Sequence, residues 1–203
     1  MERGRPRTFD KDQALDAALT VFWRSGYQGA SLSELTESMG LTKPSLYAAF
    51  GNKERLYLAA LQRYREQQLV QHAEALASEP DLKKAMRKFL RSVATMLTAE
   101  ELPGGCMVVN SAVSCDLGAL PKRIVAAIGE TVNQSSVGLL KDRLQDELRQ
   151  RHLPEGTPVE ELADYFSAFM SGMAVMAKMG ISSERLLDTI EYALCVLPSA
   201  DRK

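Results

Sequence analysis

Residues 31–53, SLSELTESMGLTKPSLYAAFGNK, constrain the fold of this 203-residue chain more than any other segment. Ser31 can cap a helix, and Glu34, three residues later, can complete a capping box. Gly40 can end that helix, because glycine adopts the left-handed conformation at a helix C-terminus without steric cost. Thr42 can then cap a second short helix. Two short helices joined by a tight glycine-containing turn are typical of the helix-turn-helix motif, in which the second helix lies in the major groove of DNA.

The second short helix is expected to carry the side chains that meet DNA bases. Pro44 fits its first turn, where a missing N–H costs least. Lys43 can donate to O6 or N7 of guanine, and the hydroxyls of Thr42 and Ser45 can bond either a base or a phosphate. Because so short a helix reads few base pairs, useful specificity requires two copies of the chain. They would bind a palindromic operator whose half-sites lie about one helical turn apart, or a multiple of it.

A further helix is expected to begin at Lys53, with Asn52 as its cap, and to run to about Ala77. The start of a helix binds phosphate well, because its backbone N–H groups are free and carry partial positive charge. The side chain of Lys53 adds a full positive charge at that point. Lys53 is therefore predicted to contact a DNA phosphate.

The first ten residues, MERGRPRTFD, form a polar arm that carries Arg3, Arg5 and Arg7. This spacing suits insertion into a narrow, A·T-rich minor groove. A solvated terminus without such a role is the equal alternative. Residues 1–65 contain ten Lys and Arg against seven Asp and Glu, whereas the remaining 138 residues contain 15 against 19. Although the net charge of the chain is −1, its positive charge lies at the end expected to bind phosphate.

One long series, ALDAALTVFWRSGYQGASLSELTESMGLTKPSLYAAFGNKERLYLAAL, carries the residues Phe22, Gly26, Tyr27, Thr42, Tyr47, Phe50 and Lys53 at characteristic spacings. On these residues, the first third of the chain resembles the DNA-binding domain of the TetR family of bacterial transcription regulators. The resemblance implies that Tyr47 contacts a phosphate. We also expect Ser31 to contact the DNA. Pro44 departs from the pattern, because many relatives carry a small residue there, and it could change the base preference.

No segment requires a strand, so we expect an all-α fold of about nine helices. An N-terminal arm and three-helix helix-turn-helix head, residues 1–52, precede a helical effector-binding and dimerisation body, residues 53–203. Breaks at Pro and Gly separate the helices of the body. The expected helices cover residues 10–26, 31–40, 42–50, 52–77, 82–97, 106–117, 121–151, 159–179 and 182–197.

The resemblance places the contact between two chains on the last two long helices. The sequence agrees, because the helix over residues 159–179 is apolar on more than one side, and such a helix is buried on more than one side. Small residues such as Gly172 would allow a partner helix to approach closely. An internal core helix is the alternative interpretation. The residues expected in the contact are Phe166, Phe169, Met170, Met173, Met176, Leu187, Ile190 and Leu194.

By the same resemblance, the middle helices enclose a pocket for a small-molecule effector. The segment GGCMVVNSAVSC places Cys106 and Asn110 four residues apart, on one face of a helix, and makes them candidates for effector contact or sensing. The partial positive charge at a helix start favours the thiolate form of Cys106, which reacts with electrophiles and oxidants. A small buried core residue is the alternative interpretation of this cysteine.

Other chemistries are disfavoured. Cys115 lies nine residues from Cys106, about half a turn around a helix, so the two cannot jointly hold a metal. His72 and His152 are the only histidines, and neither has a nearby ligand pair, so no metal and no cofactor are expected. An enzyme with Cys106 as nucleophile lacks a histidine near it in sequence. The charged N-terminus, and the absence of any apolar run of the ~18 residues that span a membrane, indicate a cytoplasmic protein without a membrane partner.

Together these features predict a homodimeric, cytoplasmic transcription regulator and not an enzyme. A repressor is expected, bound to double-stranded DNA at a palindromic operator and released when an unknown small-molecule effector binds the body. An activator is the alternative within this class. The alternative from another sensing class is a redox or electrophile switch through Cys106. A helical protein-interaction module without DNA binding would leave the basic arm and Lys53 unexplained.

Overall fold

The computed structural model describes residues 9–113, 118, 120–134 and 136–198. Over these residues the backbone forms α-helices, the 3-10 helix η2 and no strand, which confirms the all-α prediction. The expected helix over residues 121–151 is described as two segments, α7 and α8, on either side of position 135, which lies outside the described ranges. The helices are α1 (Lys11–Gly29), α2 (Leu32–Ser38), α3 (Lys43–Phe50), α4 (Lys53–Ala77), α5 (Leu82–Thr98), α6 (Met107–Val113), α7 (Lys122–Gln134), α8 (Ser136–Arg149), α9 (Val159–Lys178), α10 (Ser183–Ala193) and η2 (Leu194–Val196).

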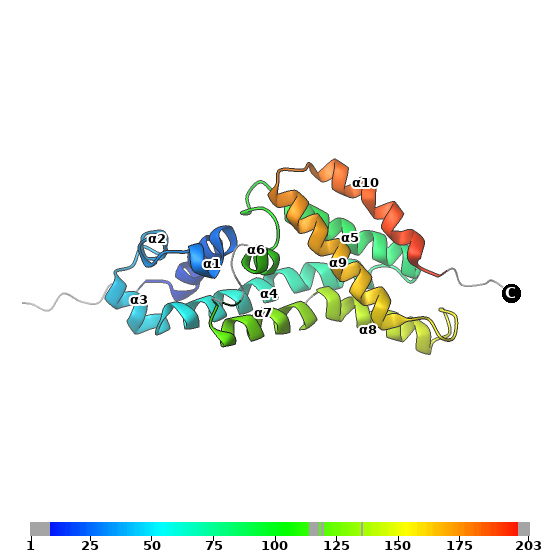
Figure 1. Cartoon of the computed structure of the whole chain (residues 1–203), viewed down its shortest axis with the longest axis horizontal. Helices are drawn as coiled ribbons and strands as arrows, with labels where there is room; N and C mark the ends of the chain where they lie inside the picture. The colour runs from blue at the N-terminus through cyan, green and yellow to red at the C-terminus, as the bar shows by residue number, and fades with distance from the viewer. Residues whose placement is uncertain (1–8, 114–117, 119, 135, 199–203) are drawn as a thin grey trace, which may run out of the picture.

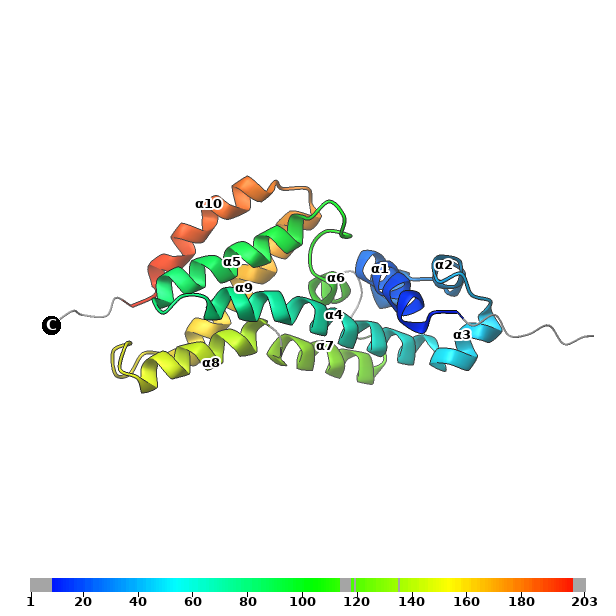
Figure 2. The same ribbon diagram turned by 180° about the vertical axis from the view of Figure 1, so that it is seen from behind.

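The helices form two groups at opposite ends of an elongated molecule. Figure 1 shows α1, α2 and α3 at one end, and α5, α8, α9 and α10 at the other. The long helix α4 runs from the first group into the second with α7 beside it, as the view from behind in Figure 2 also shows. α6 lies where the groups meet, in contact with both α1 and α9. We refer to α1–α3, together with Asn52 and the first turn of α4, as the head, and to the rest of the chain through α10 as the body.

Side-chain caps begin the helices of the head at the predicted positions. The side-chain oxygens of Ser31, Thr42 and Asn52 each accept a hydrogen bond from the backbone N–H three residues later, at 3.1, 3.3 and 2.8 Å. Each such cap contributes about 1 kcal/mol to stability. Gly40 lies between α2 and α3 with a φ of 62°, the left-handed conformation expected of it. Local signals in the sequence therefore set the boundaries of the helix-turn-helix.

One continuous apolar core joins the head to the body. Leu35 and Leu46 are completely buried in the head. The ring of Phe22 in α1 meets the ring of Tyr57 in α4 edge to face, with centroids 5.1 Å apart, a geometry that adds about 0.5–1.5 kcal/mol to the energy of burial. The hydroxyl of Tyr57 in turn donates to Oγ of Ser111 in α6 at 2.8 Å. The side chains that orient the head therefore also belong to the core of the body.

A cluster of charged side chains fastens α8 to the end of α4 that points away from the head. Arg143 donates to the carboxylate of Glu147 at 2.7 Å and to the backbone carbonyls of Leu76 and Glu79 at 2.9 and 3.1 Å. The carboxylate of Glu147 is buried, and it also lies 2.9 Å from Nδ1 of His152. Arg143 therefore supplies donors to the last turn of α4 and the loop after it, where carbonyl groups lack helical partners.

Candidate nucleic-acid interface and body cavity

The outward face of α3 carries the side chains expected to read DNA. Lys43 and Pro44 are exposed in its first turn, and Tyr47 is 44% exposed one turn later. Leu46 and Phe50 are buried against the rest of the head. The helix therefore has one side fixed in the core and one side open, which is the arrangement that a recognition helix needs to enter a groove.

Three hydroxyl groups predicted to contact DNA also take part in the helix starts. Ser31 and Thr42 cap α2 and α3 with their oxygens. Oγ1 of Thr42 also lies 2.9 Å from Oγ of Ser45, so these two hydroxyls bond each other. Because one hydrogen is shared within the pair, one hydroxyl hydrogen is left to donate to an acceptor on a base or phosphate.

Lys53 opens α4 directly beside the ring of Tyr27. Its Nζ lies 4.8 Å from the ring centroid, within the range of a cation–π contact. Partial burial lowers the pKa of the Lys53 ammonium. Burial, and to a lesser degree the nearby carboxylate of Glu54, raise the pKa of Tyr27, so its ring stays neutral. The ammonium group is therefore held at the positive end of α4, where a phosphate would bind.

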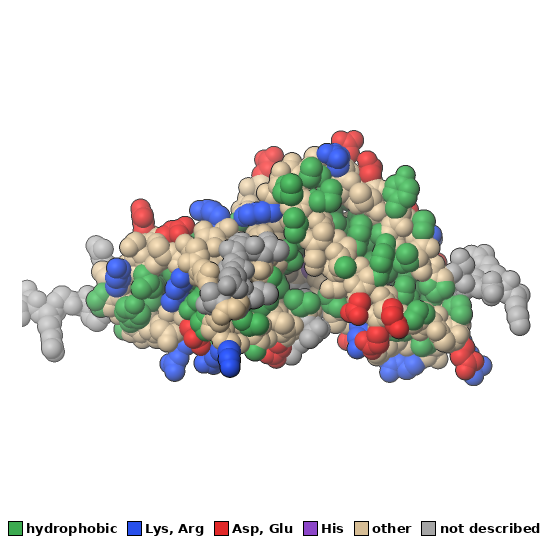
Figure 3. Space-filling model, viewed as in Figure 1, with side chains coloured by type: hydrophobic (Ala, Val, Ile, Leu, Met, Phe, Trp, Pro, Cys, Tyr) green, Lys and Arg blue, Asp and Glu red, His purple; other side chains and the backbone are tan. Residues whose placement is uncertain are grey.

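Figure 3 shows Lys and Arg side chains at several points over the head, interspersed with acidic ones. Arg3, Arg5 and Arg7 of the N-terminal arm lie outside the described residues, so their minor-groove role stays a prediction. Cys115 also lies outside them. The described part of the candidate interface therefore consists of α3, the caps around it and the start of α4.

Hydrogen bonds join the end of α1 to the loop before α6. The indole N–H of Trp23 donates to the carbonyl of Gly105 at 3.0 Å. The side-chain amide of Asn110 donates to the carbonyls of Trp23 and Gly104 at 3.0 and 3.1 Å. Asn110 is 1% exposed and its amide is turned toward α1, so it does not line the body cavity. Its expected role as an effector contact therefore stays a prediction that the cavity lining does not support.

The same loop is packed tightly against α9. Gly105 has a φ of 66°, and a Cβ there would stand only 3.0 Å from a backbone carbonyl oxygen of α9 and from Oδ1 of Asn110. Lys178 at the end of α9 donates to the carbonyl of Arg24 in α1 at 3.2 Å. We refer to Trp23, Gly105, Asn110 and Lys178 as the head–body joint, because through them α1 contacts both α6 and α9.

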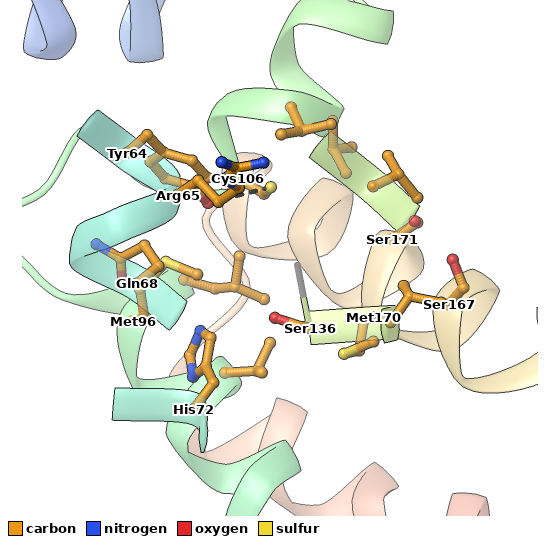
Figure 4. A pocket seen from close by; sticks show the side chains of 16 residues that line it. Tyr64, Arg65, Gln68, His72, Met96, Cys106, Ser136, Ser167, Met170 and Ser171 are labelled. Atoms are coloured by element: carbon orange, nitrogen blue, oxygen red, sulfur yellow. Dashed lines mark hydrogen bonds between the residues drawn. The ribbon is translucent and has the colours of Figure 1, made fainter. Parts of the chain in front are cut away.

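A cavity of about 90 Å³ lies inside the body, with walls from α4, α5, α6, α7, α8 and α9 (Figure 4). Cys106, the sensor candidate, stands directly before α6 and lines this cavity. The hydroxyl of Tyr64 in α4 donates to Sγ of Cys106 at 3.2 Å. Burial, and next to it the contact with Cys106, raise the pKa of Tyr64 well above its ordinary value. The phenol therefore keeps its proton and remains a donor to the sulfur.

Sequence reasoning missed His72 as a cavity residue. It is 2% exposed and lines the cavity from α4, one turn beyond Gln68. Its Nδ1 lies 2.9 Å from Oγ of Ser92 in α5. Burial lowers the pKa of His72 to about 4, so the ring is neutral at pH 7. The signal that could have found it is helical spacing, because Tyr64, Gln68 and His72 recur every four residues on one face.

The last two helices use most of their expected dimer contacts inside one chain. Five of the eight expected side chains are buried in the core of the single chain: Phe166, Met170, Met173, Ile190 and Leu194. The other three are partly buried: Phe169, Met176 and Leu187. Core packing within one chain therefore accounts for the burial of these five residues, and their place in a contact between two chains stays a prediction.

Other apolar side chains on these helices are open to solvent. Figure 3 shows hydrophobic side chains gathered over this part of the body. The large exposed ones on or directly after α9 and α10 are Tyr165, Val175, Met179, Tyr192 and Val196. A partner chain that met α9 and α10 would therefore contact these residues first.

Over the described parts of the chain, no helix is long and apolar enough to cross a membrane. The same residues contain no group of three His, Cys, Asp or Glu side chains placed to hold a metal ion. The two sites that the structure brings forward are thus the outward face of the head and the cavity of the body.

Known proteins resemble this chain along most of its length. Residues 14–60 match the family model of bacterial regulatory proteins, tetR family, and residues 83–192 that of the tetracyclin repressor-like C-terminal domain. The HTH-type transcriptional repressors ComR and BdcR of Escherichia coli are 32% and 30% identical to it. The alignment with ComR covers 97% of this chain and 92% of ComR, and that with BdcR covers 94% and 90%. A solved cysteine mutant of the TetR family transcriptional regulator CifR, complexed with 26-base-pair operator DNA, is 36% identical with a TM-score of 0.88, over 96% of this chain and 100% of that chain.

Proposed function

The chain belongs to the TetR family of bacterial regulatory proteins, and from this premise we propose that it is a transcription repressor. It binds a palindromic operator as a homodimer and leaves it when a small molecule enters the body cavity. The observation that carries the proposal is the outward face of α3, with Lys43 and Tyr47 exposed on it and Lys53 close behind. The names of ComR and BdcR as repressors, and the operator DNA bound to CifR, support it.

In the proposed complex, α3 lies in the major groove and Lys43 donates to base edges there. Tyr47 and Lys53 bind phosphates and fix the position of the helix on the duplex. Because the Lys53 ammonium already rests on the ring of Tyr27, it loses little conformational freedom when it binds. Pre-organised phosphate contacts of this kind add affinity for every DNA sequence, while the side chains of α3 select among sequences.

Two copies of the chain meet through α9 and α10 in this proposal. Exposed aromatic and methionine side chains are typical of interface cores, and Tyr165, Met179 and Tyr192 are of this kind. The contact brings two heads to one duplex, and a twofold-symmetric pair of heads requires a palindromic site.

Release from DNA is proposed to pass through the head–body joint. Gly105, which accepts from Trp23 of the head, is the neighbour of the cavity residue Cys106. A ligand that pushes α6 or the loop before it must therefore shift the carbonyl and amide groups that hold α1. Because the two heads must match the spacing of two half-sites, a small change in their orientation weakens operator binding. The two sites are then coupled by one two-state movement.

A second candidate for the signal is oxidation or alkylation of Cys106. Two observations favour it: the thiol lines the cavity, and the Tyr64 hydroxyl donates to its sulfur. A sulfur that lines a cavity can meet a molecule held inside it, and cysteine sulfur is the atom that electrophiles and peroxides modify. The same joint would transmit the change, since Cys106 directly follows Gly105.

Binding to DNA from the region upstream of its own gene, at two salt concentrations, tests the proposal. We expect specific binding to a palindrome that weakens with salt, because phosphate contacts release counterions. Lys43→Gln should lose specificity for the palindrome, whereas the control Lys141→Gln, on α8 and paired with Glu160, should not. Binding by the wild-type chain that does not distinguish this DNA from an unrelated fragment would contradict the proposal.

The signal is tested by adding peroxide to the bound complex, with Cys106→Ser as the matched variant. Release of the wild-type protein but not of Cys106→Ser supports the thiol switch. Release of neither, in a protein that binds its operator specifically, leaves reversible ligand binding in the cavity as the route.

A further inference from the structure

The hydrogen bonds around His72 determine which of its ring nitrogens carries the proton. Nδ1 lies 2.9 Å from Oγ of Ser92, so one of these two groups donates to the other. The Ser92 hydroxyl donates its only hydrogen to the carbonyl of Phe89 at 2.8 Å. Both contacts of the Ser92 hydroxyl are satisfied together when the hydrogen shared with His72 comes from the ring. In the neutral ring, Nδ1 is then protonated and Nε2 carries a lone pair.

Within the described residues, no group donates a hydrogen bond to this lone pair. His72 makes one hydrogen bond there, through Nδ1, and its ring packs edge to face on Phe89 with centroids 6.0 Å apart. The side chain is 98% buried from solvent, yet it lines the cavity (Figure 4). Among the described residues, every fully buried side-chain nitrogen or oxygen has a hydrogen-bond partner. Because Nε2 has no such partner, it is not fully buried and is open to the cavity.

The rest of the described lining is mostly apolar and carries little charge. Val93, Leu97, Val137 and Met170 form apolar walls, and the lining includes no carboxylate. Its one formally charged side chain is Arg65, which precedes His72 by about two turns of α4. A buried cation would find no counterion in these walls, and burial of an unpaired charge is costly.

The neutral state of His72 makes its lone pair available under ordinary conditions. Burial holds the pKa of the ring near 4, so a proton does not occupy Nε2 at pH 7. A ligand that brings its own hydrogen to Nε2 would satisfy a nitrogen that is otherwise buried beside apolar walls. A ligand with only acceptor groups would leave two lone pairs facing each other.

We propose that the body cavity binds a small, uncharged, mostly apolar molecule that carries one hydrogen-bond donor, such as an alcohol, and that His72 Nε2 accepts this hydrogen. The effector role of such a molecule rests on the function proposed above, whereas its binding does not. An apolar cavity of roughly 150 Å³ admits benzene, which has six non-hydrogen atoms, so the ~90 Å³ here fits a ligand of about four or five.

A series of butyl compounds of nearly equal size tests the donor and the charge separately. The probes are 1-butanol, 1-chlorobutane, n-butylammonium and butyrate, added to the full-length protein without DNA at pH 7. We expect 1-butanol to bind at least as tightly as 1-chlorobutane, although the chloride is the more hydrophobic of the two. We expect neither ion to compete with 1-butanol. Tighter binding of the chloride, or preferred binding of either ion, would overturn the proposal.

Nitrogen NMR gives a direct reading of the accepting atom, because the chain has only two histidines. The spectrum of the free protein should show His72 protonated at Nδ1, with an unprotonated Nε2. 1-Butanol should move the Nε2 resonance toward that of a hydrogen-bonded nitrogen, and 1-chlorobutane should move it much less. His152→Gln assigns the signals, since His152 lies at the Glu147 cluster and not in the cavity. Protonation at Nε2 in the free protein would contradict the inference.

Two substitutions of His72 sharpen the test. His72→Gln keeps an acceptor oxygen near the position of Nε2, whereas His72→Phe keeps an aromatic ring without one. We expect His72→Phe to lower the affinity for 1-butanol by about 3- to 10-fold relative to that for 1-chlorobutane, which corresponds to the loss of one hydrogen bond. His72→Gln should retain part of the preference. An unchanged preference in a folded His72→Phe would refute the acceptor role, and the measurements on wild-type protein decide the matter if that variant does not fold.

The outcome separates this inference from the proposed function. If 1-butanol binds through His72 and the protein also binds its operator, but operator affinity does not change with 1-butanol, the ligand class stands and its effector role fails. If the protein binds its operator and 1-butanol does not enter the cavity, the inference fails and the regulator assignment stands.

Discussion

In the head, Ser31, Thr42 and Asn52 cap helices at the surface, each bonded to the backbone three residues away. In the body, Asn110 and His72 are buried, and they bond groups 87 and 20 positions away in the chain. Removing a surface cap costs about 1 kcal/mol of folding stability. Leaving a buried polar group without its partner costs the full free energy of its desolvation. Single substitutions should therefore cost stability mainly in the body, and DNA affinity mainly in the head.

Arg143→Met should give the largest loss of stability. It removes the donor to three carbonyls at and after the end of α4 and leaves the buried carboxylate of Glu147 without its arginine. Breaking a buried ion pair in this way costs about 3–5 kcal/mol. Urea denaturation should show a lower midpoint with an unchanged slope. Arg149→Met is the control, because Arg149 pairs with Asp146 on the open surface of the same helix and should lose at most about 0.5 kcal/mol.

Equal losses of stability in Arg143→Met and Arg149→Met would show that burial does not raise the cost of removing these charged groups.

Acid should destabilise the body through His72. The pKa of this ring is about 4 in the folded chain, because of burial, and 6.5 in the unfolded one. The unfolded state therefore binds a proton first as the pH falls, so stability is full above pH 6.5 and declines between pH 6.5 and 4. The loss should reach about 3 kcal/mol at 1.36 kcal/mol for each pKa unit. Urea midpoints measured across this range should show the decline in wild-type protein and a smaller one in His72→Gln.

A decline of the same size in His72→Gln would place its source in other groups.

Asn110→Ala tests whether the head–body joint contributes to stability, to DNA binding or to the coupling between them. The substitution leaves the carbonyls of Trp23 and Gly104 without their donor, which should cost about 1–3 kcal/mol of stability. Operator binding at low temperature should persist, since α3 is untouched. The change in operator affinity caused by a cavity ligand or by peroxide should shrink, because α1 is less firmly tied to α6. A response of normal size in this variant would show that coupling takes another route.

Lys53→Met should give the smallest loss of stability and a clear loss of DNA affinity. The cation–π contact with Tyr27 is worth about 0.5–1 kcal/mol at an exposed site. Loss of a charge-assisted phosphate contact should weaken binding roughly 10-fold on every DNA sequence. The slope of log affinity against log salt should fall by about one for each such contact. A slope equal to that of wild-type protein would remove Lys53 from the interface.

The helix-turn-helix was predictable because its determinants are local. Ser31 and Thr42 stand at the caps that the sequence indicated, and Gly40 has the expected left-handed backbone. Each of these signals acts within four residues, so no knowledge of tertiary packing was needed to place them.

The residues of the body were harder to assign because their roles depend on distant partners. Asn110 shares a helix face with the position of Cys106, but the carbonyl of Trp23 turns its amide toward the head. The apolar pattern of α9 predicted burial correctly, yet it could not separate the core of one chain from a contact between two. Phe166 and Met173 proved to be core residues. The hydrogen bond that fixes the ring of His72 is made with Ser92, in another helix.

Hydroxyl-radical footprinting on DNA from the chain's own upstream region tests the central claim most directly, namely that two outward faces of α3 read one duplex. If two copies of α3 bind one duplex, we expect two protected regions of equal strength, related by twofold symmetry, with centres about one helical turn apart or a multiple of it. Lys43→Gln should abolish both regions together. A single asymmetric protected region that Lys43→Gln leaves unchanged would contradict the account.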